Sequence, residues 1–170
     1  MEQQFKNLTV LNHSVATHAL TILRDKKADI AQFRDACQSV VPCVLYEATK
    51  NLQLKDKPIQ TQLCDMVAKE LNDDVVIVPI LRAGIAMLPS TLTLLPFAKV
   101  GYFGMCRDEI TATASTYYEK LPKVEGSDVL VIDPMLATGG SSAYVIEHIM
   151  SQNPKSISLC CIVAAPEGVR

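Results

Sequence analysis

This chain of 170 residues lacks both a long apolar run and an excess of positive charge. No run reaches the roughly 18 apolar residues of a membrane span, and the first ten residues, MEQQFKNLTV, lack the apolar core of a signal peptide. The formal net charge is −2, so the chain as a whole does not attract nucleic acid or an anionic membrane. We therefore expect a cytoplasmic protein without nucleic-acid or membrane partners, in which a local site holds any anionic ligand.

The patterns of disulfide frameworks and metal sites are also missing. No CxxC pair occurs, and no histidine lies near a cysteine at a metal-ligand spacing. Several cysteines fall in apolar stretches, so we expect buried free thiols rather than disulfides or metal ligands. The three histidines have no neighbours of catalytic-triad type, and we expect no chemistry from them. The cysteines are Cys37, Cys43, Cys64, Cys106, Cys160 and Cys161.

No repeat, low-complexity tract or Gly/Ser-rich linker interrupts the chain, so we expect one domain over residues 1–170. Hydrophobic residues make up 49% and charged residues 20%, as in ordinary globular proteins. The first third has helical periodicity, and Asp29 is placed to cap its second helix. Pro42 falls inside the apolar stripe of that helix, where we expect it to kink or split the helix.

From residue 73 onward, short β-rich apolar runs alternate with helix-like segments. The runs are continuously hydrophobic, which indicates strands covered on both faces, as in a parallel sheet. This alternation predicts an α/β fold with a doubly wound, mostly parallel sheet, in which ligands bind beyond the carboxyl ends of the strands. Arg82, Arg107 and Asp133 end three of these runs. The predicted strands cover residues 75–82, 98–105, 128–134 and 156–166.

The segment VLVIDPMLATGGSSAYVIEHI, residues 129–149, places a glycine loop between a strand ending on Asp133 and a helix. Backbone N–H groups in such a loop form an anion-binding nest at the positive end of the helix, and glycine allows close approach. The loop is not of the ATPase type, because no lysine follows its last glycine, and it lacks the GxGxxG spacing. The purely structural alternative is a tight turn capped by Ser141 or Ser142.

Asp133 beside such a nest indicates a ligand with two different ends. A carboxylate next to a phosphate is electrostatically unfavourable unless it binds another part of the ligand. Sugar hydroxyls can donate to the carboxylate while the phosphate occupies the nest. We therefore predict a sugar 5-phosphate, with Asp133 accepting hydrogen bonds from the 2- and 3-hydroxyls.

The motif VIDPMLATGGS resembles the phosphoribosyl-diphosphate (PRPP) signature of the uracil phosphoribosyltransferase family. Pro134 stands where most other type I phosphoribosyltransferases carry a second acid, which favours the uracil branch. The resemblance covers nearly the whole chain and implies a type I phosphoribosyltransferase fold with a helical N-terminal region and a flap hairpin. The other matching segments, in the family's order, are LYEAT (45–49), VPILRAG (78–84), RDE (107–109), YYEKLP (117–122) and VAAPEG (163–168).

The resemblance implies an enzyme of pyrimidine salvage that converts PRPP and uracil to UMP and diphosphate. It implies that Arg82 and Arg107 bind the diphosphate and that Asp133 binds the ribose, with Asp133 and Arg107 as the catalytic residues. Mg²⁺ is the expected cofactor, held through the substrate and water with no direct protein ligand. The rest of the expected PRPP-binding loop is Pro134, Met135, Leu136, Ala137, Thr138, Gly139, Gly140 and Ser141.

Each of these assignments has an alternative. Arg82 could form a surface ion pair, and Arg107 could belong to a solvated cluster with Asp108 and Glu109. The segment RDEITATASTYYEKL suits a flap, in which Tyr117 and Tyr118 could simply pack the hairpin onto the body of the protein.

The family continues with a segment that forms the hood over uracil, and this chain does not contain it. We therefore expect a domain that is incomplete at its C-terminal end relative to the family, with no uracil-binding residue in residues 1–170. Action on another base and a non-catalytic, PRPP- or nucleotide-binding regulatory role are the alternative functions. The resemblance also implies a homodimer or higher homo-oligomer and a possible GTP activator.

Overall fold

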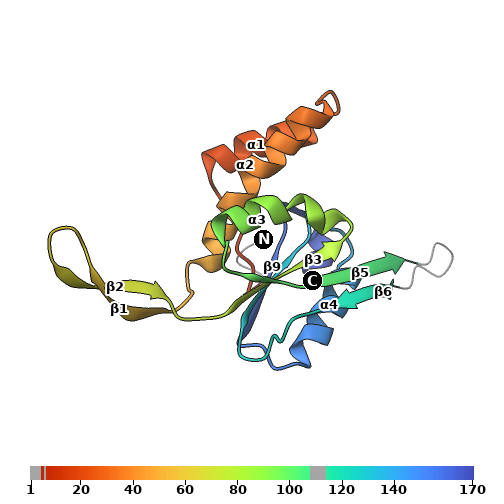
Figure 1. Cartoon of the computed structure of the whole chain (residues 1–170). Coiled ribbons are helices and arrows are strands. Elements are labelled where there is room, and N and C mark those ends of the chain that lie inside the picture. The colour runs from red at the N-terminus through yellow and green to blue at the C-terminus, as the bar shows by residue number, and fades with distance from the viewer. Residues whose placement is uncertain (1–4, 6, 108–113) are drawn as a thin grey trace.

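The computed structural model describes residues 5, 7–107 and 114–170, and its centre is a twisted, mostly parallel sheet (Figure 1). The strand order is β6-β5-β3-β7-β9, and β4 also pairs with β3. All pairings in this sheet are parallel except that of β5 with β6. The strands are β3 (Val75–Leu81), β4 (Lys99–Val100), β5 (Tyr102–Arg107), β6 (Ala114–Lys120), β7 (Asp128–Ile132) and β9 (Ser156–Cys160). The predicted α/β fold class is confirmed.

The middle strands β3 and β7 carry apolar side chains on both faces. Ile77 and Leu130 lie in one core cluster, whereas Val76 and Val129 lie in the other. Successive strand residues point to opposite faces, so a continuously hydrophobic strand must be covered on both. Helices α2 (Ile30–Thr49) and α3 (Leu88–Leu94) cover one face, with α1 (Ser14–Arg24) packed on α2, and α4 (Gly140–Met150) covers the other face (Figure 1).

Helix α2 begins as the sequence predicts and continues past its proline. Asp29 accepts a hydrogen bond from the Gln32 N–H at 2.8 Å, and the Gln32 side chain accepts one from the Asp29 N–H at 3.0 Å, which forms a capping box. Of the two outcomes expected at Pro42, a kink or a split, the split does not occur, because α2 is one helix from Ile30 to Thr49. Val41 and Leu45 beside it are fully buried, and this packing offsets the lost backbone hydrogen bond.

The predicted strand over residues 156–166 is shorter than expected. Strand β9 ends at Cys160, and the chain then pairs with a different segment through β10 (Val163–Ala164). This strand runs parallel to β8 (Met135–Leu136), inside the glycine loop that precedes α4. The last element is the short helix α5 (Pro166–Val169).

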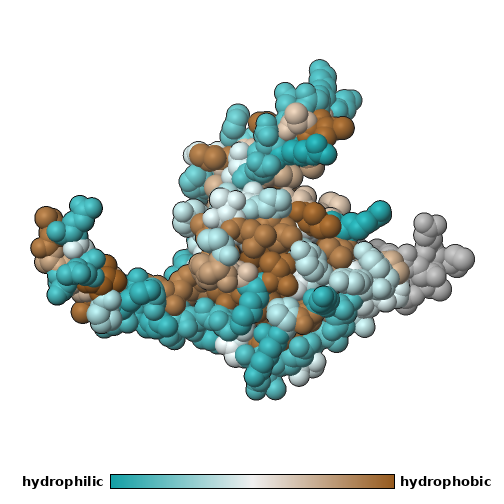
Figure 2. Space-filling view, in the orientation of Figure 1, coloured by the Kyte–Doolittle hydropathy of each residue, from teal (hydrophilic) through white to brown (hydrophobic). Residues whose placement is uncertain are grey.

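A two-stranded hairpin, which the sequence analysis did not assign, extends away from the sheet (Figure 1). It consists of β1 (Leu54–Gln60) and β2 (Asp65–Leu71), which pair only with each other among the described strands. We call this element the hairpin arm. Its surface mixes charged and apolar side chains, as Figure 2 shows. The exposed apolar residues of the arm are Leu54, Ile59, Leu63, Met66 and Val67.

All six cysteines are free, as expected. Cys37 and Cys160 are buried, but Cys64 and Cys106 are exposed, so the expectation of burial is wrong for those two. Cys64 lies in the turn of the hairpin arm, and Cys106 lies on β5 and lines an open cavity. No helix within the described ranges is long and apolar enough to cross a membrane.

An ionic cluster joins the amino ends of three strands at the edge of the sheet opposite the glycine loop. Lys155, just before β9, forms ion pairs with Asp73 before β3 and, at 3.5 Å, with Asp128 at the start of β7. Asp128 is buried and also accepts a hydrogen bond from Ser156. The hydrogen bond from Lys155 lowers the pKa of Asp73. The cluster therefore favours the folded state wherever Asp73 is ionised.

We predict that Lys155→Met lowers the melting temperature at pH 7. The pKa of Asp73 is lower in the folded state than in the unfolded state. The ionised Asp73 therefore contributes its full stabilisation above the unfolded-state pKa of about 3.9, and this stabilisation is lost as pH falls through the folded-state pKa. The difference in melting temperature between wild type and Lys155→Met should therefore become smaller below about pH 4. Thermal unfolding followed by circular dichroism from pH 3 to pH 7 measures this difference.

The matched control is Lys123→Met, because Lys123 pairs with Glu125 at 2.8 Å with both side chains largely exposed. Such surface pairs contribute little to stability. Equal melting temperatures of Lys155→Met and wild type at pH 7 would contradict the role given to the cluster.

Candidate functional site

Two charged residues predicted for the site follow neighbouring parallel strands. Arg82 follows β3 and Asp133 follows β7, and the last paired residues of these strands are Pro79 and Ile132. Both side chains therefore start from the carboxyl edge of the sheet, where ligands of doubly wound folds bind. The structure brings them to the same edge, with the glycine loop directly after Asp133.

Arg82 is presented by a tight turn that depends on Gly84. A Cβ at Gly84 would lie 2.5 Å from the Ile132 carbonyl oxygen and 3.1 Å from backbone atoms of Pro79. Only glycine therefore lets the 3₁₀ turn Ala83–Ala86 pack directly onto β3 and β7. The peptide bond between Leu81 and Arg82 is cis, and the Arg82 side chain is exposed at the mouth of this turn.

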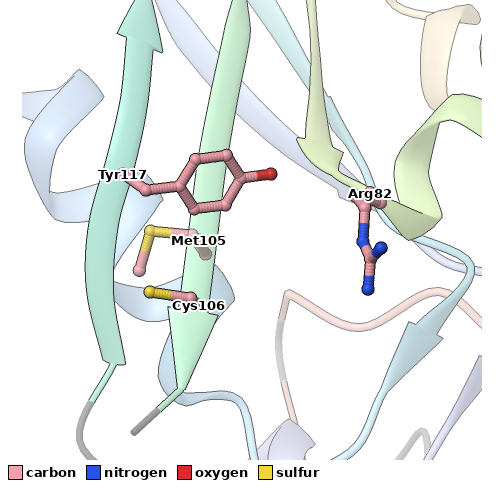
Figure 3. A pocket seen from close by; sticks show the side chains of 4 residues that line it. All are labelled: Arg82, Met105, Cys106 and Tyr117. Carbon is pink, nitrogen blue, oxygen red and sulfur yellow. The ribbon is translucent and has the colours of Figure 1, made fainter.

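An open cavity of about 570 Å³ lies between Arg82 and the β5–β6 hairpin. Figure 3 shows Arg82 on one side and Met105, Cys106 and Tyr117 on the other. These three lining residues were not predicted as site residues. For Tyr117, packing of the hairpin onto the body of the protein was the alternative to a place in the flap.

A β-bulge accounts for the position of Tyr117. Gly104 pairs with Tyr118 and Met105 with Thr116, so Tyr117 is the extra residue on β6. Its ring lies against Gly104, where a Cβ would approach ring atoms to 2.7 Å. The bulge aims Tyr117 at the cavity that faces Arg82. A glycine in a strand is the sequence signal that could have predicted this close approach.

Asp133 is half-buried at the junction of β7 and the glycine loop. Burial raises the pKa of its carboxyl group, and a hydrogen bond from the Met135 backbone N–H opposes that change. Its own N–H donates to the Cys160 carbonyl at 3.2 Å, which holds it against the end of β9. Hydroxyl donors of a ligand would stabilise the ionised carboxylate, which burial disfavours.

The glycine loop turns directly into α4. Gly139 has φ +83° and is the N-cap of α4, with no side-chain hydrogen bond to cap the helix. Neither Ser141 nor Ser142 caps α4, so the structural alternative for these serines is wrong. Ser142 instead lies within α4 and is buried. Backbone N–H groups at this helix start can bind an anion, and Ala137, Thr138 and Gly140 beside them are exposed.

The other predicted residues of this loop take part in local pairing or face outward. Met135 and Leu136 form β8, and the Met135 side chain is exposed. Pro134 accepts two backbone hydrogen bonds from the segment after β9. The predicted stretch from Pro134 to Ser141 thus runs from the end of β7 through β8 into the first residues of α4.

Arg107 is the last residue of β5, at the end of the hairpin that faces Arg82. Its side chain lies outside the described residues, as do Asp108 and Glu109, so its role stays a prediction. The described residues contain no group of three or more His, Cys, Asp or Glu side chains that could hold a metal ion. Mg²⁺ bound through the substrate likewise stays a prediction.

Comparisons with known proteins agree on one family. The family model described as uracil phosphoribosyltransferase matches residues 10–170. The uracil phosphoribosyltransferase of Bifidobacterium animalis subsp. lactis is 43% identical over 166 residues, which are 96% of this chain and 78% of that protein. The uracil phosphoribosyltransferase of Clostridium tetani is 43% identical over 165 residues, which are 96% of this chain and 79% of that protein.

Solved structures show the same fold. The AQ2163 protein from Aquifex aeolicus superposes with a TM-score of 0.89 at 33% identity, over 95% of this chain and 78% of that one. A hypoxanthine phosphoribosyltransferase from Staphylococcus aureus superposes with a TM-score of 0.59 at 15% identity, over 78% of this chain and 65% of that one, and shows the fold alone.

We predict that Asp133→Asn keeps or raises the melting temperature at pH 7. A carboxyl pKa raised by burial means that the ionised group destabilises the folded state above that pKa, and an amide removes this cost. The advantage in melting temperature should shrink as pH falls through the raised folded-state pKa of Asp133, and it should be gone below the unfolded-state pKa of about 3.9, where both states of the wild type are protonated.

Calorimetric scans of wild type and variant between pH 3.5 and pH 7 test this expectation. Asp128→Asn is the contrasting variant, because Asp128 is paired with Lys155 and Ser156, and its loss should lower the melting temperature. A clear fall for Asp133→Asn at pH 7 would mean that the Asp133 carboxylate stabilises the fold.

Proposed function

The chain belongs to the uracil phosphoribosyltransferase family, and from this premise we infer that it transfers the 5-phosphoribosyl group from PRPP to uracil, giving UMP and diphosphate. It is an enzyme of pyrimidine salvage with PRPP and uracil as substrates. Arg82 and Asp133 follow two paired strands, and the glycine loop lies between Asp133 and α4. This placement is the observation on which the assignment of the function to named residues rests.

The proposed binding mode assigns each end of PRPP to a different element. The glycine loop and the start of α4 bind the 5-phosphate through backbone N–H groups. Asp133 accepts hydrogen bonds from the 2- and 3-hydroxyls of the ribose. Arg82 binds the diphosphate with charge-assisted hydrogen bonds, and the amides of the tight turn after it face the same anion. PRPP would thus lie along the carboxyl edge of β3 and β7.

In the reaction, the bond between ribose C1 and the diphosphate oxygen breaks, and a bond from a uracil ring nitrogen to C1 forms. Negative charge grows on the leaving diphosphate while positive charge grows on the sugar ring. Arg82 stabilises the negative charge on the diphosphate, and the ionised Asp133 holds the ribose ring, on which the positive charge develops. We also propose that Arg107 approaches the diphosphate from the β5–β6 hairpin, since it directly follows Cys106, which lines the cavity together with Arg82.

Mg²⁺ fits this donor set as a partner of the substrate. It prefers oxygen ligands and keeps several waters, so PRPP oxygens and water would hold it with no direct protein ligand. Bound there, the ion would neutralise part of the diphosphate charge. We assign uracil binding to no residue of this chain, and the matched relatives that are named above favour no non-catalytic alternative.

We further propose that the protein is a homodimer or higher homo-oligomer that uses the hairpin arm. An isolated two-stranded hairpin is at best marginally stable in water, and this arm exposes several apolar side chains. Leu63 at its turn is 96% exposed. A second copy of the chain would cover such a surface. A cytoplasmic location and activation by GTP are proposals that rest on the family alone.

The test of the function is UMP formation by the purified chain from uracil and Mg²⁺–PRPP, followed by chromatography. Product formation supports the enzyme, and repetition with and without GTP tests activation. If PRPP binds but no UMP forms, the non-catalytic alternative replaces the proposal.

Arg82→Ala should weaken binding of PRPP and of diphosphate but not of UMP, which has no diphosphate. Loss of charge-assisted hydrogen bonds costs about 1.5–3 kcal/mol, or roughly 10- to 100-fold in affinity. Titration calorimetry with the three ligands measures this pattern. Arg34→Ala, an exposed arginine on α2, is the control and should leave all three affinities unchanged. Equal losses for the three ligands would remove Arg82 from the diphosphate site.

Leu63→Asp should weaken self-association, because a charge replaces an apolar side chain that the partner copy would bury. Burial of a leucine contributes about 1.5–3 kcal/mol, so the dissociation constant should rise roughly 10- to 100-fold. Analytical ultracentrifugation over a range of concentrations measures the constant.

Gln62→Asp is the matched control for Leu63→Asp, since it adds the same charge at the neighbouring exposed position without removing an apolar side chain. It should associate as the wild type does. A monomeric wild type, or equal effects of the two variants, would contradict the role of the arm.

A further inference from the structure

The glycine loop is packed, backbone against backbone, on the last helical turn of the chain. A Cβ at Gly168 in α5 would lie 2.4 Å from the Ala137 carbonyl oxygen and 3.0 Å from Leu136 Cγ. In the other direction, a Cβ at Gly139 would lie 3.1 Å from the Gly168 carbonyl oxygen. Real Cβ atoms do not approach a backbone oxygen to 2.4 Å, so any side chain at position 168 must displace the loop.

Hydrogen bonds hold the two segments in this register. The N–H groups of Ile162 and Val163 both donate to the Pro134 carbonyl, each at 3.1 Å. The Ala165 N–H donates to the Leu136 carbonyl at 2.7 Å. Since β8 and β10 also pair in parallel, the stretch 162–168 forms a backing for the loop. We call it the backing segment.

Local conformation does not explain glycine at position 168. Among the described glycines only Gly126 and Gly139 have positive φ, so the backbone at Gly168 is one that any residue can adopt. The residue lies in a helix, where alanine is favoured over glycine by about 1 kcal/mol. The close approach to Ala137 is the feature that requires glycine.

We propose that Gly168 is a positioning residue for the 5-phosphate of PRPP. It touches no substrate in this assignment. It acts by letting α5 support the carbonyl of Ala137, which fixes the path of the loop into Gly139 and the first N–H groups of α4. This inference rests on the proposed function, because it takes the glycine loop as the phosphate site.

A substitution at Gly168 that acts on the phosphate site and one that acts only on folding differ in which ligand binds more weakly. The diphosphate is assigned to Arg82, whose turn packs through Gly84 on Ile132 and Pro79, whereas Gly168 packs on Leu136 and Ala137. A displaced glycine loop therefore weakens binding of the 5-phosphate end alone. General loss of folding would weaken both ends and lower the melting temperature.

The experiment measures binding of ribose 5-phosphate and of diphosphate to the full chain by titration calorimetry, in wild type and Gly168→Ala. We expect Gly168→Ala to weaken ribose 5-phosphate binding by about tenfold or more and to leave diphosphate binding within about twofold. Unchanged affinity for ribose 5-phosphate, or equal loss for both ligands, would overturn the proposal.

The control is Gly126→Ala, at the opposite edge of the sheet. Gly126 has φ +71° and open space around it, so alanine there strains the backbone without touching the site. It should lower the melting temperature and leave both affinities unchanged. A loss of ribose 5-phosphate binding in Gly126→Ala would mean that lowered stability alone accounts for the effect, and would overturn the proposal.

A second variant covers the case in which Gly168→Ala does not fold. Ala165→Pro removes the N–H that donates to Leu136, at a φ of −85° that proline tolerates. It should also reduce affinity for ribose 5-phosphate more than for diphosphate, and the opposite order would contradict the inference. A wild type that binds diphosphate but not ribose 5-phosphate would overturn the assignment of the loop itself, which is a separate result.

Discussion

The parallel pairing of β3 with β7 is the constraint on which the rest of the site depends. Five residue pairs, from Val75 with Asp128 to Pro79 with Ile132, fix the register of the two strands. Because both strands are buried on both faces, a slip of the register would expose apolar side chains or bury polar ones. Arg82 and Asp133 occupy the same edge as a direct result. The packing of Gly84 against Ile132 then ties the arginine turn to the strand that carries the aspartate.

The sequence predicted this arrangement because its signals are local. Continuous apolar runs indicate buried parallel strands, and the residues at their ends must share an edge, so the placement of Arg82 and Asp133 required only periodicity and one topological rule. The capping box at Asp29 is equally local. The family resemblance added the chemistry, and the comparisons support it along nearly the entire chain.

Features that depend on contacts between distant segments were not predicted. Tyr117 faces the cavity because of a β-bulge in the pairing of β5 with β6. The sequence pattern of either strand alone does not specify where that bulge lies. The hairpin arm has no apolar alternation, because no face of it packs on the sheet, so periodicity gives no signal. A split of α2 at Pro42 does not occur because the burial of Val41 and Leu45 is a tertiary effect that outweighs local proline geometry.

The backing segment also has a consequence for the order in which the protein forms. The glycine loop ends at Gly140, yet the backbone groups that hold it lie at residues 162–168, more than twenty positions later in the chain. During synthesis from the N-terminus, the strands β3 and β7 can pair while the loop still lacks these partners. The anion nest can take its final shape only after residue 168 has left the ribosome. A nascent chain would thus acquire its sheet before it could acquire affinity for its ligand.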